Sequence, residues 1–125
     1  MARNTITIAT GIDISSCSGS GPTYTAEYSS YDLITLGIKV GDWITANKRV
    51  AGAGGSSTIS SVYTYQVIAI IDMERLTIKY ISDSNGDGDD SPCDLPSGTG
   101  SSGSPNKAPH TFYRDLGAAF LMFVD

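Results

Sequence analysis

The middle of the chain reads VYTYQVIAIIDMERLTIKYI from Val62 to Ile81. Apolar and polar residues alternate over 62–71, so one face of an extended strand would carry Tyr63, Tyr65, Val67, Ala69 and Ile71. Residues 76–81 alternate in the same way, and the four residues 72–75 between the two runs suit a tight connection. The pattern predicts a β-hairpin.

Two more strands are predicted on the N-terminal side of this hairpin. Residues 5–10 (TITIAT) alternate, which places Ile6 and Ile8 on one face. Residues 38–45 (IKVGDWIT) form an apolar segment that bends at Gly41-Asp42. The glycine-rich residues 49–57 that follow are expected to form a loop without a packed core.

The residues between these two strands are expected to be less regular. Residues 15–22 (SSCSGSGP) read as a loop, and residues 23–31 read as an extended, half-exposed segment that contains Tyr24, Tyr28 and Tyr31. Residues 32–37 predict a short helical turn that Asp32 caps and Gly37 ends. The apolar side chains of this turn are expected to cover the end of a barrel; they are Leu33, Ile34 and Leu36.

The composition favours the same class of fold. The chain has 125 residues, the length of one ordinary domain, and it contains 17 serines, 12 threonines and 14 glycines. Such a mixture suits strands and turns better than helices. We therefore expect residues 1–125 to form a single all-β domain: a small, partly open barrel or sandwich, with an SH3-like or OB-like hairpin core and long Ser/Gly/Asp-rich loops.

Two segments lie outside this predicted core. Residues 82–109 are rich in Ser, Gly, Asp and Pro, and they read as a long loop insertion. Apolar residues return in the C-terminal segment 110–125. Residues 118–124 fit a buried strand, and a helical stripe fits equally well through Phe112, Leu116, Ala119, Phe120 and Phe123. We favour the strand because of its β context, and expect it to pair locally or with a neighbouring subunit through Phe120, Leu121 and Phe123.

Charge and hydropathy exclude several classes of partner. The formal net charge is −5 and no cluster of Lys or Arg is present, which argues against binding to nucleic acid. The N-terminus lacks a secretory signal, and the longest apolar run, Leu116–Val124, is too short to span a membrane. We expect a soluble chain that is made in the cytoplasm and has no membrane partner.

The order of strand, Gly-Asp turn, strand, glycine-rich loop and hairpin resembles small β modules in virion proteins of tailed bacteriophages. Residues 36–44 (LGIKVGDWI), with 65–70 (YQVIAI) and 76–78 (LTI), look like their "GV-x-x-GD-x-I … V-x-x-I … L-T-I" pattern. The match covers roughly residues 32–81. It implies a structural role in a capsid, neck or tail, and it implies no catalytic residues.

This resemblance sets the expected function. The chain is expected to be a non-enzymatic capsid decoration or cement protein in the virion, made in the host cytoplasm, which binds the major capsid protein or other virion subunits and forms a homo-oligomer or symmetric assembly. The first alternative is a head-to-tail connector or tail accessory subunit. The second is a carbohydrate-binding adhesion module.

The acidic stretch after the hairpin is a candidate calcium loop. Residues 83–89 (DSNGDGD) match the start of the D-x-[DN]-x-[DN]-G pattern, in which oxygen ligands alternate and glycine allows a sharp turn. The candidate ligands are Asp83, Asn85, Asp87, Asp89 and Asp94. Asp90 at the eighth position and the following Pro92-Cys93 depart from the usual pattern, and the alternative is a solvated acidic turn. The chain therefore has either no cofactor or calcium.

The remaining polar residues give weaker signals. Cys17 and Cys93 either form a disulfide that ties the early loop to the late one or stay as two free thiols. His110 is the only histidine, and it reads as a loop residue because no nucleophile motif accompanies it. Trp43 is expected to pack in the core or at its rim, with core packing favoured; an exposed Trp43 that stacks on a sugar ring is the alternative.

Overall fold

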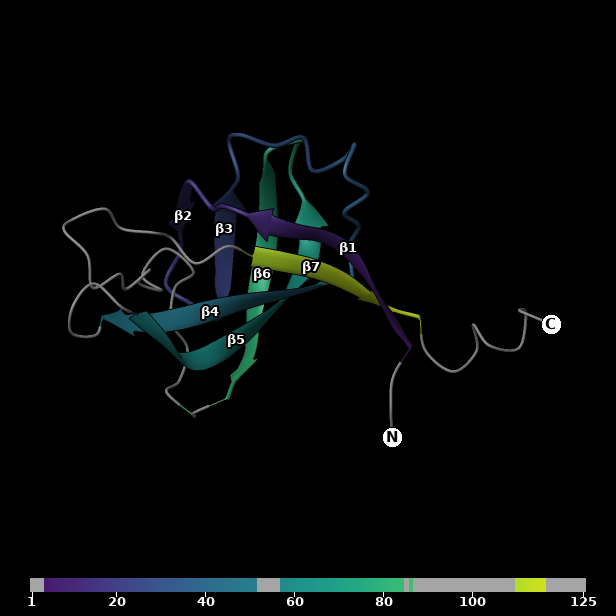
Figure 1. Cartoon of the computed structure of the whole chain (residues 1–125). Helices are drawn as coiled ribbons and strands as arrows, with labels where there is room; N and C mark the ends of the chain where they lie inside the picture. Colours follow the sequence, from purple (N-terminus) through teal and green to yellow (C-terminus); the bar gives the residue numbers. More distant parts are fainter. Residues whose placement is uncertain (1–3, 52–56, 85, 87–109, 117–125) are drawn as a thin grey trace.

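The chain folds into one antiparallel sheet of seven strands in the part that the structure describes (Figure 1). The structure is a computed structural model, and it describes residues 4–51, 57–84, 86 and 110–116. The strands are β1 (Thr5–Ile12), β2 (Ser16–Ser18), β3 (Thr23–Glu27), β4 (Trp43–Ala51), β5 (Ser57–Ile70), β6 (Arg75–Asp83) and β7 (His110–Asp115). Their order in the sheet is β1-β7-β4-β5-β6-β3-β2. The all-β prediction is confirmed.

The sheet bends strongly around one core. Figure 1 shows β1, β7 and β4 crossing β3 and β6 at a steep angle, and the long strand β5 joins the two halves. Bulges interrupt the β5–β6 ladder between Thr64 and Tyr65 and between Val67 and Ala69. A bulge bends its strand and increases the twist, which lets β5 belong to both halves.

The two ends of this sheet are not joined by a ladder among the described residues. The edge strands β1 and β2 are instead consecutive in the chain, linked through residues 13–15. Ile14 in this link is only 3% exposed, and the Ser15 amide donates a hydrogen bond to the carbonyl oxygen of Glu27 beside β2. The architecture is therefore a partly open barrel or sandwich, as predicted.

The β5–β6 hairpin forms as predicted. Ile70 pairs with Leu76, and the Ile71 and Asp72 amides both donate to the Arg75 carbonyl oxygen across the turn. Tyr63, Tyr65 and Val67 are fully buried, but Ile71 is 51% exposed. The prediction for Ile71 is wrong because the bulge after Val67 ends the strict alternation.

The tyrosines of residues 23–31 were predicted to be half-exposed, and this is wrong for two of them. Tyr24 and Tyr28 are 4% and 0% exposed. The reason is that β3 lies between β2 and β6, so Tyr24 on an alternate position faces the core. Tyr28 directly follows β3, and its amide donates a hydrogen bond to the Glu74 carbonyl oxygen. Fifteen buried apolar residues form one cluster: Ile12, Ile14, Tyr24, Ala26, Tyr28, Leu33, Ile38, Ile44, Ala46, Tyr63, Tyr65, Val67, Leu76, Ile78 and Phe112.

The first two predicted segments need smaller corrections. Strand β1 extends two residues beyond the predicted Thr10, and Ile6 is 44% exposed because β1 is an edge strand. Residues 15–22 were predicted to be a loop only, yet the three residues of β2 pair there with β3. Cross-strand pairing to β3, rather than local propensity, makes this short strand.

The segment 32–37 is a turn and not a helix. Asp32 caps it as predicted: its carboxylate accepts hydrogen bonds from the amide and the hydroxyl of Thr35. Gly37 ends the turn with φ of +91°, a conformation that favours glycine. Leu33 is buried, whereas Ile34 and Leu36 are 58% and 38% exposed, so only one of the three apolar residues covers the barrel end.

The C-terminal segment contains a strand that the sequence pattern did not locate. Strand β7 (His110–Asp115) lies between β1 and β4, although the favoured strand was 118–124, which is outside the described residues. The predicted loop 82–109 lies mostly outside the described residues as well. No helix within the described part of the chain is long and apolar enough to cross a membrane.

Candidate functional site

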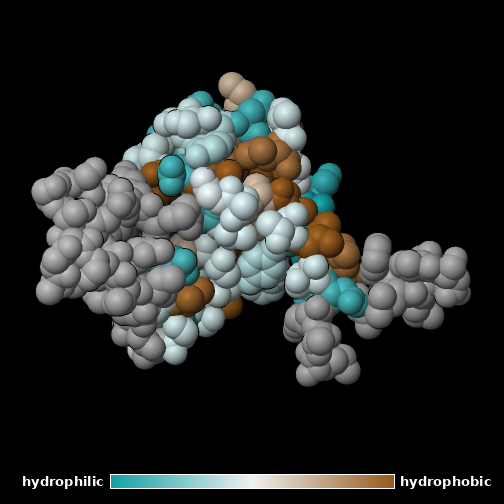
Figure 2. Space-filling model, viewed as in Figure 1, coloured by the Kyte–Doolittle hydropathy of each residue, from teal (hydrophilic) through white to brown (hydrophobic). Residues whose placement is uncertain are grey.

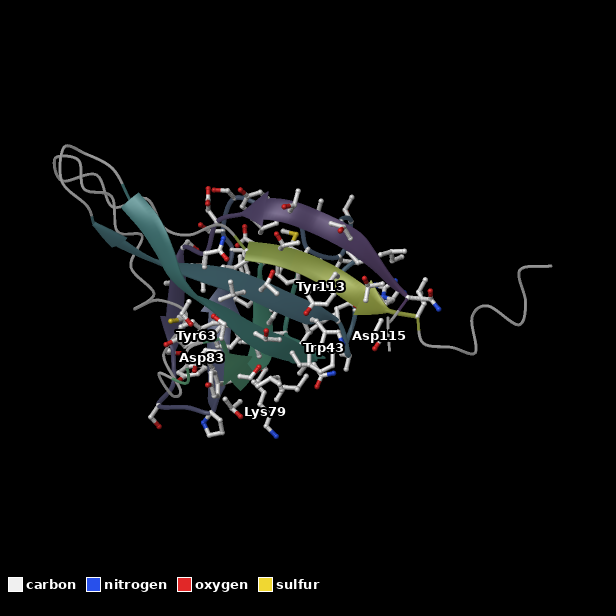
Figure 3. The ribbon with its side chains drawn as sticks, turned by 60° about the horizontal axis from the view of Figure 1, so that its bottom comes forward. Trp43, Tyr63, Lys79, Asp83, Tyr113 and Asp115 are labelled. Atoms are coloured by element: carbon white, nitrogen blue, oxygen red, sulfur yellow. The ribbon has the colours of Figure 1, made fainter. Side chains whose placement is uncertain are left out.

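A pocket of about 220 Å³ lies on the outer face of the sheet, over β1, β7, β4 and β5. The described residues that line it are Thr5, Trp43, Thr64, Tyr113 and Asp115. Figure 3 shows Trp43, Tyr113 and Asp115 close together on this face. The pocket is the strongest candidate for a ligand site because it combines two aromatic rings with a carboxylate and two hydroxyls.

Strand register explains why these residues meet. Trp43 in β4 is the direct partner of Tyr113 in β7, and Thr5 in β1 is the direct partner of Asp115. Tyr113 and Asp115 are two residues apart on one strand and therefore share a face. Their neighbours in sequence point inward, since Ile44 and Phe112 are fully buried.

Trp43 does not belong to the core cluster, so of the predicted core or rim packing the favoured core position is wrong. It is half-buried on the outer face, where it lines the pocket. Successive residues of β4 point to opposite faces of the sheet. Ile44 and Ala46 are buried on the inner face, so Trp43 lies on the outer face. Only the pairing of β4 with β7 shows which face Trp43 occupies.

A partly buried ion pair on the inner side fixes the two aromatic residues. Asp42 directly precedes Trp43, and Arg114 directly follows Tyr113. Arg114 donates from Nε to Oδ1 of Asp42 at 2.7 Å and from Nη2 to Oδ2 at 2.8 Å, a bidentate arrangement. Asp42 is 1% exposed, and its hydrogen bonds to the guanidinium raise the pKa of Arg114. The pair holds the start of β4 against the end of β7.

The same carboxylate organises the preceding turn. Oδ2 of Asp42 also accepts a hydrogen bond from the Lys39 amide at 2.8 Å, and Arg114 Nη2 donates to the Gly37 carbonyl oxygen at 2.8 Å. The Gly41 amide donates to the Val67 carbonyl oxygen, and the Val67 amide donates to the Asp42 carbonyl oxygen. The Gly-Asp turn of the sequence pattern is thus a structural anchor.

Asp115 is the one charged side chain among the described residues that line the pocket. Burial raises the pKa of the Tyr113 hydroxyl, and the nearby charge of Asp115 raises it further. The phenol therefore stays neutral and is available as a hydrogen-bond donor. With an adjacent carboxylate, the pocket disfavours an anionic ligand and offers strong acceptors to hydroxyl groups.

A second surface is an apolar end formed by two segments that lie side by side. The Leu33 amide donates to the Met73 carbonyl oxygen, and Gly41 is bonded to Val67, so residues 33–41 run along the tip of the β5–β6 hairpin. Six of the eight large apolar side chains that are exposed among the described residues lie here: Ile34, Leu36, Val40, Ile68, Ile71 and Met73. We call these six residues the apolar end. In Figure 2 hydrophobic surface extends from the upper part of the molecule, where this turn lies, down the right side over β1.

His110 was expected in a loop, and that prediction is wrong. It is the first residue of β7, is 1% exposed, and its Nδ1 lies 2.8 Å from the Tyr28 hydroxyl in a hydrogen bond. Burial lowers the pKa of His110 to about 4 and raises that of Tyr28 far above its usual value. A neutral, buried imidazole with a buried partner is a core element and not a catalytic base that substrate reaches.

The other predicted site residues are only partly described. Asp83 ends β6 and accepts a hydrogen bond from the Tyr80 hydroxyl at 2.6 Å, whereas Asn85, Asp87, Asp89 and Asp94 lie outside the described residues. Among the described residues no three His, Cys, Asp or Glu side chains are grouped to hold a metal ion. Calcium binding in this stretch therefore stays a prediction.

Most of the remaining predicted residues also lie outside the described part of the chain. Cys17 in β2 is disulfide-bonded, and the second cysteine of the chain, Cys93, lies outside the described residues. The partner-binding residues Phe120, Leu121 and Phe123 are outside them too. Of the residues that sequence reasoning missed, Tyr113, Arg114 and Asp115 lie in HTFYRD, where the strand propensity of Thr, Phe and Tyr is the signal that could have found a strand.

Comparisons of the chain with protein-family models, with curated proteins and with solved structures find no match.

Proposed function

We propose that the chain is a non-enzymatic structural protein of a virion, of the capsid decoration or cement type, which stabilises the shell by contacts with the major capsid protein. The observation that supports this proposal best is the apolar end, where Ile34 and Val40 are 58% and 60% exposed. Contiguous apolar surface on a soluble protein is typical of a protein interface.

The physical gain of such a contact comes from repetition. When a subunit binds the assembled shell, each Å² of apolar surface that it buries contributes about 25 cal/mol of favourable free energy. Because the subunit binds the assembled shell and not its free components, this binding shifts the assembly equilibrium toward the shell. Symmetry repeats this contribution at every equivalent position of the shell. A small protein of this kind needs an exposed, well-held surface and no reaction chemistry.

The apolar end coincides with the part of the chain that resembles phage virion modules. All six of its residues lie within residues 32–81, and the anchor Asp42 holds the turn that presents Val40. The negative net charge also fits a subunit that contacts protein and not the packaged genome. A head-to-tail connector or tail accessory subunit would use the same surface, and only its position in the particle would differ.

The test is the copy number of the chain in purified virions, measured by quantitative mass spectrometry relative to the major capsid protein. A decoration protein is expected in a fixed ratio close to that of the capsid protein, in multiples set by the symmetry of the shell. A connector or tail subunit is expected at a small ring number per particle. Absence of the chain from the virions would refute a structural role in the particle.

Two matched variants then test the surface. Val40→Asp adds a charge to the apolar end, whereas Ile81→Asp adds the same charge at a 40% exposed apolar position on β6, outside the apolar end. We expect Val40→Asp to lower incorporation into particles at least tenfold and Ile81→Asp to leave it within twofold, with both proteins folded by circular dichroism. Equal incorporation of the two variants would show that the apolar end is not the contact surface.

A further inference from the structure

We propose that the pocket between Trp43 and Tyr113 binds one pyranose ring of a neutral saccharide. The pocket gathers residues from four strands, with Thr5 from β1, Trp43 from β4, Thr64 from β5, and Tyr113 and Asp115 from β7. The inference does not depend on the virion role, because none of the six residues of the apolar end lines this pocket.

The two aromatic residues supply the apolar part of the recognition. Trp43 and Tyr113 are paired across β4 and β7, and both are half-buried, so part of each ring is accessible from the pocket. An indole or phenol ring offers a large, rigid apolar face at little entropic cost. The face of a pyranose ring that carries C–H groups is the matching surface, since its hydroxyls project mainly from the ring edge.

The polar residues of the pocket supply partners for those hydroxyls. The Asp115 carboxylate accepts hydrogen bonds and is stronger than a neutral acceptor, while the Thr5 and Thr64 hydroxyls both donate and accept. Asp115 and Thr5 are direct cross-strand partners, and Thr64 comes from the other side of Trp43, on β5. Polar groups on both sides of the rings suit a ligand with a hydroxylated edge.

Other ligand classes fit the pocket less well. A phosphate or carboxylate would find no Lys, Arg or His among the described residues that line the pocket. An ammonium ion would use the rings and the carboxylate, but it would leave both threonine hydroxyls without a role. The volume of about 220 Å³ is below the 300–1,000 Å³ of pockets for drug-sized ligands, and it therefore suits one sugar ring and not a long flat aromatic ligand.

The inner ion pair makes the pocket a preformed site. Because Asp42 and Arg114 are the sequence neighbours of Trp43 and Tyr113, their bidentate contact fixes the two backbones that carry the rings. A preformed site loses little conformational entropy when its ligand binds. A single-ring ligand, which gains only a small contact area, needs this advantage.

The chain carries its own reporter for the test. Trp43 is the only tryptophan, so its fluorescence reports on this pocket alone. The full chain is titrated at millimolar concentrations with glucose, galactose, mannose and N-acetylglucosamine, and separately with tetramethylammonium chloride. We expect a saturable change in Trp43 emission with at least one of the four sugars, and we expect saturation-transfer NMR to show contact with the C–H face of that sugar.

Variants then assign the binding to the pocket. Measured by saturation-transfer NMR, Trp43→Ala and Asp115→Asn should each weaken sugar binding about tenfold or more, and Trp43→Phe should recover part of the loss because it restores a ring. Thr45→Ala is the matched control, since Thr45 lies on the same face of β4 but does not line the pocket. Circular dichroism checks that each variant is folded.

Three results would overturn the inference. A saturable response to tetramethylammonium alone would make the pocket an ammonium site, and no saturable response to any of the four sugars by the folded chain would exclude pyranose binding. Sugar binding that survives Trp43→Ala unchanged would place the sugar elsewhere. None of these results affects the virion proposal, which is measured by copies per particle.

Discussion

Asp42 connects the Gly-Asp turn with the last described strand through its two carboxylate oxygens. Both oxygens accept hydrogen bonds from Arg114, and Oδ2 also accepts one from the Lys39 amide. The carboxylate is almost fully buried, whereas the Arg114 side chain is 28% exposed. Loss of the negative charge would leave the guanidinium held against the protein without its partner, which is costlier than loss of a surface pair.

The first prediction is that Asp42→Asn lowers the free energy of unfolding by about 2–4 kcal/mol. The matched control is Asp72→Asn, which removes the ion pair with Arg75; the two side chains are 41% and 52% exposed. We expect a much smaller loss there, because solvent screens an exposed pair. Urea unfolding at neutral pH measures both. Equal losses in the two variants would mean that the Asp42–Arg114 pair does not anchor the fold.

His110 gives the second prediction, which concerns pH. Burial lowers the pKa of its imidazole to about 4, against about 6.5 in the unfolded chain. Between these two values the unfolded state binds more protons than the folded state, so stability rises with pH. The contribution of His110 is fully present above about pH 6.5, decreases as the pH falls toward 4, and amounts to about 3 kcal/mol in total.

Urea unfolding between pH 5 and 7 measures this slope. Below that window the carboxylates also contribute, since hydrogen bonds from the backbone lower the pKa values of Asp32 and Asp72. His110 is the only histidine in the chain, so His110→Phe is expected to flatten the dependence in the window, even though it leaves the Tyr28 hydroxyl without this hydrogen bond. A steep slope that persists in His110→Phe would assign the effect to other groups.

At the scale of elements, the described part of β7 is complete without the residues that follow it. Its ladder with β1 joins Thr5 to Asp115, its ladder with β4 joins Trp43 to Tyr113, and the Leu116 amide donates to the Asn4 carbonyl oxygen. The third prediction is that a chain ending at Leu116, which lacks Phe120, Leu121 and Phe123, keeps its melting temperature within a few degrees and assembles more weakly.

Thermal circular dichroism and native mass spectrometry of the shortened chain separate these two effects. The control is the full chain with Phe120→Ala, Leu121→Ala and Phe123→Ala, which retains the backbone but removes the apolar side chains. If the shortened chain unfolds, the C-terminal segment is part of the core, and its predicted role in partner binding is wrong.

Strand β2 gives the fourth prediction. It has only three residues and lies at an edge of the sheet, where it pairs with β3 alone, and Cys17 at its centre is disulfide-bonded. We expect the predicted partner, Cys93, to be confirmed by peptide mass mapping without reduction. Because the enclosed loop is long, reduction is expected to cost about 2–4 kcal/mol of stability. Two thiols that alkylate without reduction would exclude the disulfide.

The sequence predicted the elements whose pattern is local. The β5–β6 hairpin follows from alternation and from a short turn, and the cap at Asp32 follows from its distance to Thr35. The pocket and the anchor depend on pairs that are far apart in the chain: 72 residues separate Asp42 from Arg114, and 82 separate Tyr28 from His110. Composition and periodicity do not indicate which distant strands become neighbours, so the face of Trp43 and the burial of His110 were not predictable.

For the whole molecule, the same long-range pairs determine how the protein unfolds. The seven strands share one sheet, and the buried residues form one cluster. No strand of the sheet has a separate core to keep it folded when the others open. The fifth prediction is therefore a single cooperative transition, with coincident curves from Trp43 fluorescence, which reports on β4, and from far-UV circular dichroism, which reports on all strands.

The kinetics follow from the same topology. Strand β7 pairs with β1 at the far end of the chain, so a large loop must close before this ladder contributes any stability. Proteins dominated by such non-local pairing fold in milliseconds to seconds, and we expect stopped-flow refolding in that range.

Two variants test the order in which the strands pair: Thr7→Ala on β1 and Thr77→Ala on the local β5–β6 hairpin. If the β1–β7 pair forms late, Thr7→Ala should mainly speed unfolding, while Thr77→Ala should slow folding. Two separate equilibrium transitions, or a Thr7→Ala variant that mainly slows folding, would contradict this sequence of assembly.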